Sequence, residues 1–201
     1  MMPNNELTVF DLDGTLIGVN SFREISKRSL FKMIGSRQWS SAVALLWHYG
    51  LRKAGIHTHL SFKRKIIAIF ETTFSEREKD DMASQVFLHY LNSEVYRRFL
   101  STERCIVSTA SPYAFVSRMP LKKECRVVSS CQPGQPWPVE DNFKQGKVEN
   151  LKALLKVDRV QIGCLYTDSE DDRPLMDCSE RIYMVRDGIP VQIESHVGLF
   201  Q

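Results

Sequence analysis

A short apolar run followed at once by two aspartates constrains this chain more than any other feature. The stretch TVFDLDGTLIG, residues 8–18, contains the end of an expected buried strand, 7–10, and then Asp11 and Asp13. Two carboxylates one residue apart repel each other, and burying them is costly unless a cation or hydrogen-bond donors compensate. We therefore expect distant parts of the chain to bring compensating groups to this point.

The residues after this strand predict helices only, up to about residue 96. The capping-box sequences SFRE (21–24) and SERE (75–78) each predict a helix start, and apolar periodicity predicts helices over 39–51 and 60–70. Strands and helices then alternate, with strands expected at 104–111, 125–130, 160–168, 181–185 and 190–194. Helices are expected to start at Pro112, in the first helical position, and near residue 147.

This alternation predicts the α/β class, a Rossmann-like parallel sheet with an inserted all-helical domain. We expect residues 1–17 and 97–201 to form the α/β core and residues 18–96 to form the insert.

The net charge of +3 is unevenly distributed. Residues 18–70 contain ten Lys or Arg residues and one acidic residue, Glu24, so this segment is about +9 and the remainder about −6. Such asymmetry indicates an anionic partner, which could be a phosphate, a nucleic acid or an acidic membrane face. A solvated helical surface is an equally good interpretation of the same pattern.

Residues 41–51, SAVALLWHYGL, are the most apolar stretch of the insert. About eleven residues are too few for the roughly 20 that span a bilayer, so the stretch predicts a core helix or, less favoured, an interfacial one. Trp39, Val43, Leu46 and Trp47 are expected on one side of the helix over 39–51, and Trp39 and Trp47 in the core or at an interface.

Localisation is predicted from two further features. No signal peptide is recognisable, and the five cysteines include no C-x-x-C pair, which indicates a reducing cytoplasm without a disulfide framework. The basic insert allows association with the inner face of a membrane.

Polar clusters follow several expected strands, and the carboxyl ends of parallel strands meet at one edge of a sheet. The clusters comprise Asp11 and Asp13, the stretch STASP with Ser108, Thr109 and Ser111, the pair Asp168 and Asp172, and Lys147 at the head of a helix. Carboxylates suit Mg²⁺, and a carboxylate can attack phosphorus. Hydroxyl and N–H groups at a helix start suit a phosphoryl group, and a lysine offsets the negative charge.

The four motifs DLDGT, STAS, GKVENL and YTDSEDD, in this order, resemble those of the haloacid dehalogenase (HAD) superfamily of phosphohydrolases. The resemblance implies a phosphatase that works through an aspartyl-phosphate. It implies that Asp11 is the nucleophile, that Asp13 is the general acid and base, and that Ser108 and the Thr109 backbone bind the phosphoryl group.

The resemblance also implies a Mg²⁺ site and a catalytic lysine. Asp11, the backbone carbonyl of Asp13 and Asp168 would bind the ion, with Asp172 acting through water or behind them. Lys147 would hold both the phosphoryl group and Asp11, although Lys144 is a rival for this role. Thr167 stands where the family has glycine, and its side chain is expected to narrow the mouth of the site.

The substrate is open between two branches of the superfamily. A helical insert after the first motif resembles the cap of phosphoserine-phosphatase-like enzymes, which selects the substrate, but Asn20 replaces the glutamate that holds an amino group. YTDSEDDRPLM is similar to the fourth motif of phosphatidylglycerophosphatase C-like enzymes, which implies a lipid phosphate such as phosphatidylglycerophosphate. A small soluble phosphomonoester, a phosphoserine or a sugar phosphate, has nearly equal weight.

Two other functions are disfavoured. A dehalogenase does not need the acid at Asp13, and a non-catalytic module that binds anions or nucleic acid does not need the complete set of motifs. We therefore expect a phosphomonoester and an anionic membrane surface, and no nucleic acid, as partners.

Overall fold

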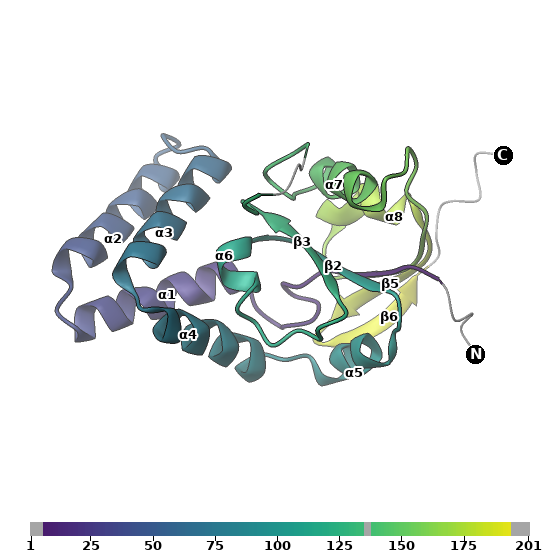
Figure 1. Ribbon diagram of the computed structural model, residues 1–201, viewed down its shortest axis with the longest axis horizontal. Helices are drawn as coiled ribbons and strands as arrows, with labels where there is room; N and C mark the ends of the chain where they lie inside the picture. The colour runs from purple at the N-terminus through teal and green to yellow at the C-terminus, as the bar shows by residue number, and fades with distance from the viewer. Residues whose placement is uncertain (1–5, 135–137, 194–201) are drawn as a thin grey trace. The chain divides into compact units, whose positions relative to one another are not determined.

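The strands and helices form one six-stranded sheet and a separate group of helices in a computed structural model, which describes residues 6–134 and 138–193. The strand order is β3-β2-β1-β4-β5-β6. The predicted α/β class is confirmed (Figure 1). The chain divides into two compact units: unit 1 comprises residues 1–20, 90–113 and 121–201, and unit 2 comprises residues 21–89 and 114–120.

The sheet belongs to unit 1 and is centred on β1. Its strands are β1 (Thr8–Phe10), β2 (Cys105–Pro112), β3 (Arg126–Ser130), β4 (Ile162–Thr167), β5 (Ser179–Arg186) and β6 (Ile189–Ile193). Strands β1 to β5 are parallel, and β6 is antiparallel to β5. Thr8 pairs with Cys105 on one side and Cys164 on the other, so β1, β2 and β4 end close together at one edge.

Helices cover both faces of this sheet (Figure 1). α7 (Gln145–Leu155) and α8 (Arg173–Met176) lie on one face, where Val9, Leu151 and Leu165 belong to an apolar core. α5 (Ser93–Ser101) lies on the other face, where Phe99 packs edge-on against Phe10. Because successive side chains of β1 point to opposite faces of the sheet, this strand contributes to the apolar core on each face.

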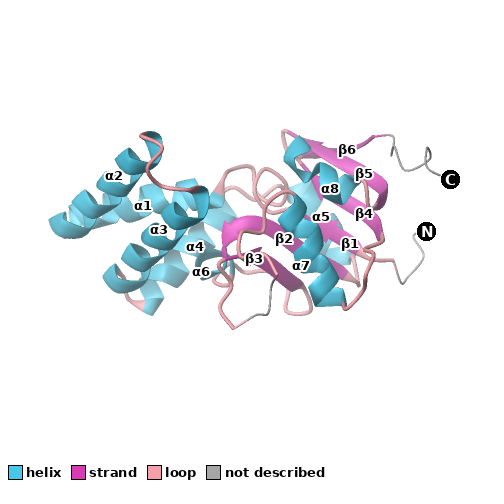
Figure 2. Cartoon of the chain, turned by 90° about the horizontal axis from the view of Figure 1, so that it is seen from above, coloured by secondary structure: helices cyan, strands magenta, loops and turns pink. Residues whose placement is uncertain are grey.

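Unit 2 consists mainly of four helices: α1 (Ser21–Gly35), α2 (Trp39–Lys53), α3 (His59–Thr73) and α4 (Glu76–His89). These helices are cyan in Figure 2; α2 packs against α1 and α3, and α4 packs against α1. Phe115 in α6 (Tyr113–Val116) packs against Phe22 and Phe70 in the core of this unit. Buried Lys79 pairs with Glu71 and Glu76.

The expected insert, residues 18–96, overlaps the helices of unit 2. Its boundaries, and its role as a domain that selects substrate, stay predictions.

Several details differ from the expectations. Pro112 is the last residue of β2 and does not open the following helix. Helix α5 was not predicted as a separate helix; of its nine residues, Val95 and Phe99 are buried. Glu194, the end of the last expected strand, lies outside the described residues.

Trp39 and Trp47 were expected in the core or at an interface, and the apolar stripe that they form with Val43 and Leu46 on α2 is not part of the core. Only Ala42 and Leu45 of this helix are buried, while the stripe is exposed. The exposed fractions are 59% for Trp39, 64% for Val43, 53% for Leu46 and 65% for Trp47. Among the described residues, no helix is both long and apolar enough to cross a membrane.

Candidate active site

The carboxyl ends of β1, β2 and β4 surround a hollow of about 360 Å³, all of whose lining residues belong to unit 1. The backbone N–H of Asp11 donates to the carbonyl of Tyr166 at 2.9 Å, which continues the pairing of β1 with β4 up to the site. The lining residues include Asp11, Asp13, Gly14, Asn20, Thr109, Phe143, Lys147, Asp168, Asp171 and Asp172. Residues more than 150 positions apart in the sequence therefore line one hollow.

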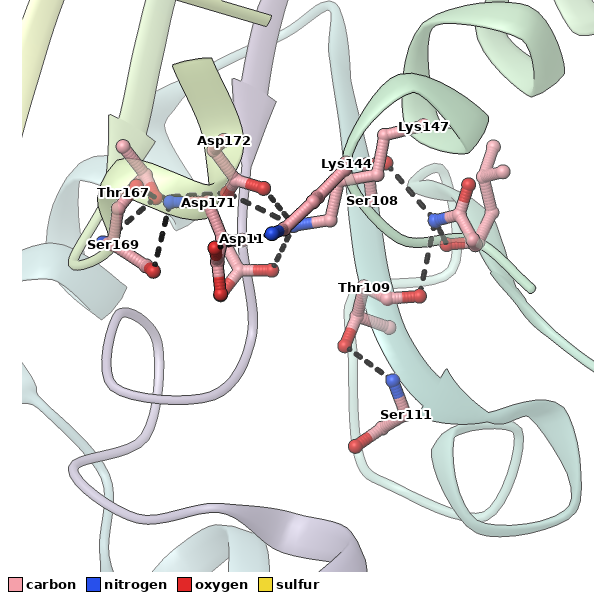
Figure 3. Close-up of polar contacts among 12 residues, drawn as sticks. Asp11, Ser108, Thr109, Ser111, Lys144, Lys147, Thr167, Ser169, Asp171 and Asp172 are labelled. Carbon is pink, nitrogen blue, oxygen red and sulfur yellow. Dashed lines mark hydrogen bonds and ion pairs between the residues drawn. The ribbon is translucent and has the colours of Figure 1, made fainter. Parts of the chain in front are cut away.

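The Lys147 ammonium lies between two buried carboxylates (Figure 3). Its Nζ is 2.8 Å from Asp11 Oδ1 and 2.7 Å from Asp172 Oδ1. All three side chains are at most 10% exposed. Lys147 reaches this point from the first turn of α7, where a Cβ on Gly146 would lie 2.5 Å from the Asp141 carbonyl oxygen, so glycine is required beside it.

Burial dominates the electrostatics of this group. Loss of hydration raises the pKa of Asp11 to about 8. The positive charge of Lys147 opposes that rise, whereas Asp172 and Asp13 add to it. The pKa of Lys147 is itself raised, because the charges and hydrogen bonds of Asp11 and Asp172 outweigh the cost of burial. One lysine therefore does not fully compensate the carboxylates gathered here.

Asp13 and Asp168 complete the acidic group. Ser111 Oγ donates to Asp13 Oδ2 at 2.6 Å, so β2 fixes the orientation of the second aspartate. Gly14 has a φ of +75°, and a Cβ there would lie 2.0 Å from Asp168 Oδ2. Only glycine allows Asp168 to lie so close to the first motif, which explains the Asp-Gly pair that follows β1.

The residues expected to bind a phosphoryl group lie near the end of β2. Thr109 and Ala110 line the hollow, whereas the buried Ser108 hydroxyl accepts a hydrogen bond from Asn142 Nδ2 at 3.2 Å. Asn142 also donates to the carbonyl oxygens of Thr109 and Val128, and so ties β2 to β3. Sequence reasoning missed Asn142, since nothing in its loop distinguishes it. The expected phosphoryl contact of Ser108 stays a prediction.

Lys144 and Thr167 both differ in position from the roles considered for them. Lys147, not Lys144, contacts Asp11, while Lys144 is an exposed residue paired with Asp171 at 3.3 Å. Thr167 does not narrow the mouth of the hollow as expected: its side chain is fully buried and donates to Asp172 Oδ2 at 2.8 Å. The threonine thus orients a carboxylate that binds Lys147.

The donors at this edge fit Mg²⁺. If Asp11, Asp13, Asp168 and Asp172 are ionised, they outnumber the buried Lys147 by four charges to one. Among the described residues, no group of three or more His, Cys, Asp or Glu side chains has the geometry to hold a metal ion. The expected Mg²⁺ ligands are not such a group of three side chains. They are the carboxylates of Asp11 and Asp168 and the backbone carbonyl of Asp13. Such oxygen donors, completed by water, are the kind that Mg²⁺ takes.

Solved structures and a family model match this chain. No curated protein matches the chain. A crystal structure of a protein of unknown function from Bordetella pertussis Tohama I is 15% identical, with a TM-score of 0.63 over 90% of each chain, and is similar in fold. A HAD family hydrolase from Salmonella enterica subsp. enterica serovar Typhi is also 15% identical, and the match covers 88% of this chain and 60% of that one at a TM-score of 0.44.

A model of the haloacid dehalogenase-like hydrolase family matches residues 8–177, which include Asp11, Lys147 and Asp172. Because that match covers most of the chain, this protein belongs to the haloacid dehalogenase-like hydrolase family.

Proposed function

We propose that this protein is a Mg²⁺-dependent phosphatase that hydrolyses phosphomonoesters through an aspartyl-phosphate on Asp11. The contact of Lys147 with both Asp11 and Asp172, beside Asp13, is the observation that carries the proposal. Lys147 donates to Asp11, and its positive charge favours the ionised form that a nucleophile needs.

Asp13 suits the role of general acid and base. Asp11 attacks phosphorus, and the bond from phosphorus to the ester oxygen breaks while Asp13 gives that oxygen a proton. Asp13 then takes a proton from water, which attacks phosphorus and releases Asp11. Ser111 donates to Asp13 Oδ2 and so orients the carboxyl group that would transfer the proton.

Lys147 would stabilise the negative charge that develops on the transferring phosphoryl group, together with N–H groups near Thr109. Asp11, the carbonyl of Asp13 and Asp168 would hold Mg²⁺, with Asp172 behind them. When bound, the ion supplies positive charge that favours the ionised form of Asp11 and neutralises phosphoryl oxygens.

The test compares wild type with Asp11→Asn, and with Asp177→Asn as a matched control. Asp177 is an exposed aspartate that pairs with Arg173 outside the hollow. We expect turnover of p-nitrophenyl phosphate that requires Mg²⁺ and stops with a chelator. Asp11→Asn should abolish it, and Asp177→Asn should retain it.

Acid quenching during turnover should trap a phosphoryl group on the peptide that contains Asp11, and hydroxylamine should remove it. Turnover that persists in Asp11→Asn, or a phosphoryl group trapped elsewhere, would overturn the mechanism.

We further propose that the substrate is an anionic lipid phosphate, such as phosphatidylglycerophosphate, reached at a membrane surface. The exposed stripe on α2 borders a hollow of about 520 Å³, whose lining includes Val43, Leu46 and Trp47. Arg37 precedes this helix, Arg52 and Lys53 lie in its last turn, and all three would attract anionic lipids. Unit 2 would then act as the cap that selects the substrate.

A small soluble phosphomonoester is the alternative, although Asn20, which lines the hollow of unit 1, brings no carboxylate for a substrate amino group. Phosphatidylglycerophosphate in detergent micelles, phosphoserine and sugar phosphates should be assayed side by side. Sedimentation with phosphatidylglycerol vesicles should fall in Trp47→Glu but not in Leu88→Glu, an equally exposed residue on α4. Preference for a soluble ester, with no vesicle binding, would reject the lipid proposal.

A further inference from the structure

A second group of reactive side chains lies in unit 1, where β2 and β3 begin. Ile106 of β2 pairs with Arg126 of β3 in parallel register, so the residues just before them, Cys105 and Cys125, are neighbours across the two chains. Adjacent strands lie about 4.8 Å apart, within the range of Cα separations of about 4.4–6.8 Å that a disulfide requires. The two thiols are close enough for each to shift the pKa of the other. A bond between them therefore needs little backbone movement.

The surroundings of Cys105 favour its thiolate. The neighbouring Cys125 thiol lowers the pKa of Cys105 to about 7; burial opposes this effect, and Lys122 adds to it. Lys122 is held in place because its ammonium donates to the carbonyl of Phe99 at 2.9 Å. The pKa of Cys178, by contrast, is raised by burial. A thiolate is the reactive form of cysteine, so Cys105 differs in reactivity from Cys178.

Small molecules can approach this pair. Cys105 lines a hollow of about 310 Å³, together with residues that include Glu124 and Arg126. Cys125 is half-buried, and Cys105 is 5% exposed. A molecule as small as a peroxide fits into such a hollow.

We propose that Cys105 and Cys125 are a redox modification site, at which a hydroperoxide produces a reversible disulfide between β2 and β3. The Cys105 thiolate attacks one peroxide oxygen, the O–O bond breaks, and a sulfenic acid and one hydroxide form. The sulfur of Cys125 then attacks the sulfur of Cys105, and the S–O bond breaks. With hydrogen peroxide, the two thiols are oxidised by two electrons, and the peroxide is reduced to two waters.

Such a site agrees with the expectation that the chain has no disulfide framework. In reducing compartments, disulfides are usually transient and formed by redox-sensing or catalytic cysteines. The cross-link would join the two ends of residues 105–125 into a covalent loop. This loop contains the end of β2, with Ser108 and Thr109. The inference does not depend on the proposed phosphatase activity, because its readout is the thiols themselves.

The test treats the full chain with hydrogen peroxide, blocks the remaining thiols by alkylation and digests with trypsin. We expect a linked pair of peptides, 105–118 and 124–126, that is two hydrogens lighter than the separate peptides and that dithiothreitol separates. The midpoint of thermal unfolding should rise by roughly 5 °C on oxidation and return on reduction.

Two variants identify the order of the steps. In Cys125→Ser, peroxide should leave a sulfenic acid on Cys105 that dimedone captures, whereas Cys178→Ser, the matched control, should form the disulfide as wild type does. Oxidation of Cys131 or Cys178 before Cys105 would overturn the proposal, as would bonds only between chains. Mapping of the wild-type chain decides the question even if Cys125→Ser does not fold.

Discussion

Lys147 in unit 1 and Lys79 in unit 2 are both buried lysines that contact two carboxylates, but their partners differ. The side chains of Asp11 and Asp172 are 10% and 4% exposed, whereas those of Glu71 and Glu76 are 36% and 73% exposed. The pKa values reflect this difference. Beside Lys147, burial raises the pKa of Asp11 to about 8, while beside Lys79, hydrogen bonds from Lys79 and Arg118 lower the pKa of Glu76.

The comparison separates two uses of a buried lysine. Around Lys79, the glutamates remain hydrated, so the ammonium gains partners at little cost and ties α3 to α4. Around Lys147, several carboxylates lose their hydration on folding, and this loss opposes folding. An arrangement of this kind is not needed to hold α7 in place. Perturbed carboxylates that line a hollow are typical of sites whose arrangement serves chemistry. The variants below test that distinction, from the largest expected effect to the smallest.

The largest effect is expected for Lys147→Met. Methionine retains much of the apolar stem but removes the charge between Asp11 and Asp172, so the transferring phosphoryl group loses a stabilising cation. We expect kcat/KM for p-nitrophenyl phosphate to fall about 10³-fold at saturating Mg²⁺. Circular dichroism should confirm that the variant is folded. A fall of less than tenfold would remove Lys147 from the mechanism.

Lys79→Met should have the opposite profile. Loss of the two ion pairs should lower the free energy of unfolding by about 1–2 kcal/mol, a modest value because Glu71 and Glu76 can remain hydrated. Urea unfolding measures this change. Activity per folded molecule should stay within about twofold of wild type. If Lys79→Met and Lys147→Met lost activity equally, the distinction between the two lysines would fail.

Thr167→Val tests whether the carboxylates of Lys147 need further buried donors. The variant preserves shape but removes the hydroxyl that donates to Asp172, so this carboxylate is less firmly oriented. We expect kcat to fall about tenfold, equivalent to about 1.4 kcal/mol. Thr72→Val is the control, because the Thr72 hydroxyl donates to the Ala68 carbonyl on an exposed part of α3. Equal rates for Thr167→Val and wild type would show that Asp172 needs no such support.

The sequence predicted the site around Lys147 better than the network around Lys79. The aspartates and hydroxyls of unit 1 follow strands, and parallel strands bring their ends together whatever their separation along the chain. The contact of Lys147, on a helix, with Asp11, 136 residues away, was implied by the resemblance to a known family. The partners of Lys79 depend on how helices pack, and a charge pattern along one helix does not determine this.

Side-chain direction was the least predictable property. Periodicity placed Trp39, Val43, Leu46 and Trp47 on one side of α2 but could not show that this side is exposed and that Ala42 and Leu45 face the core. Thr167 was misjudged for a related reason, since strand alternation does not reveal that its hydroxyl reaches Asp172. Both properties depend on which neighbours pack against the residue.

The smallest effect concerns an exposed carboxylate of unit 2. Glu78 accepts hydrogen bonds from the N–H and hydroxyl of Ser75 at 2.9 and 2.8 Å, at the start of α4. These bonds, with Lys32, lower its pKa to about 2 from an ordinary 4.5. Between these values, the unfolded chain binds more protons than the folded one, so this contribution to stability is present above pH 4.5 and is lost as the pH falls towards 2.

Glu78→Gln isolates that contribution, because glutamine can still accept from Ser75 but carries no charge. The midpoint of thermal unfolding should fall slightly at pH 6, and the difference from wild type should shrink as the pH is lowered to 3. Ser75→Ala, which removes the hydroxyl donor, should reduce the same pH dependence only in part, because the backbone N–H of residue 75 and Lys32 still favour the charged form of Glu78. A difference between wild type and Glu78→Gln that stayed constant with pH would mean that packing, not the charge of Glu78, produces the effect. Glu78 would then stabilise unit 2 through packing, whereas Glu71 and Glu76 stabilise it through their ion pairs with Lys79.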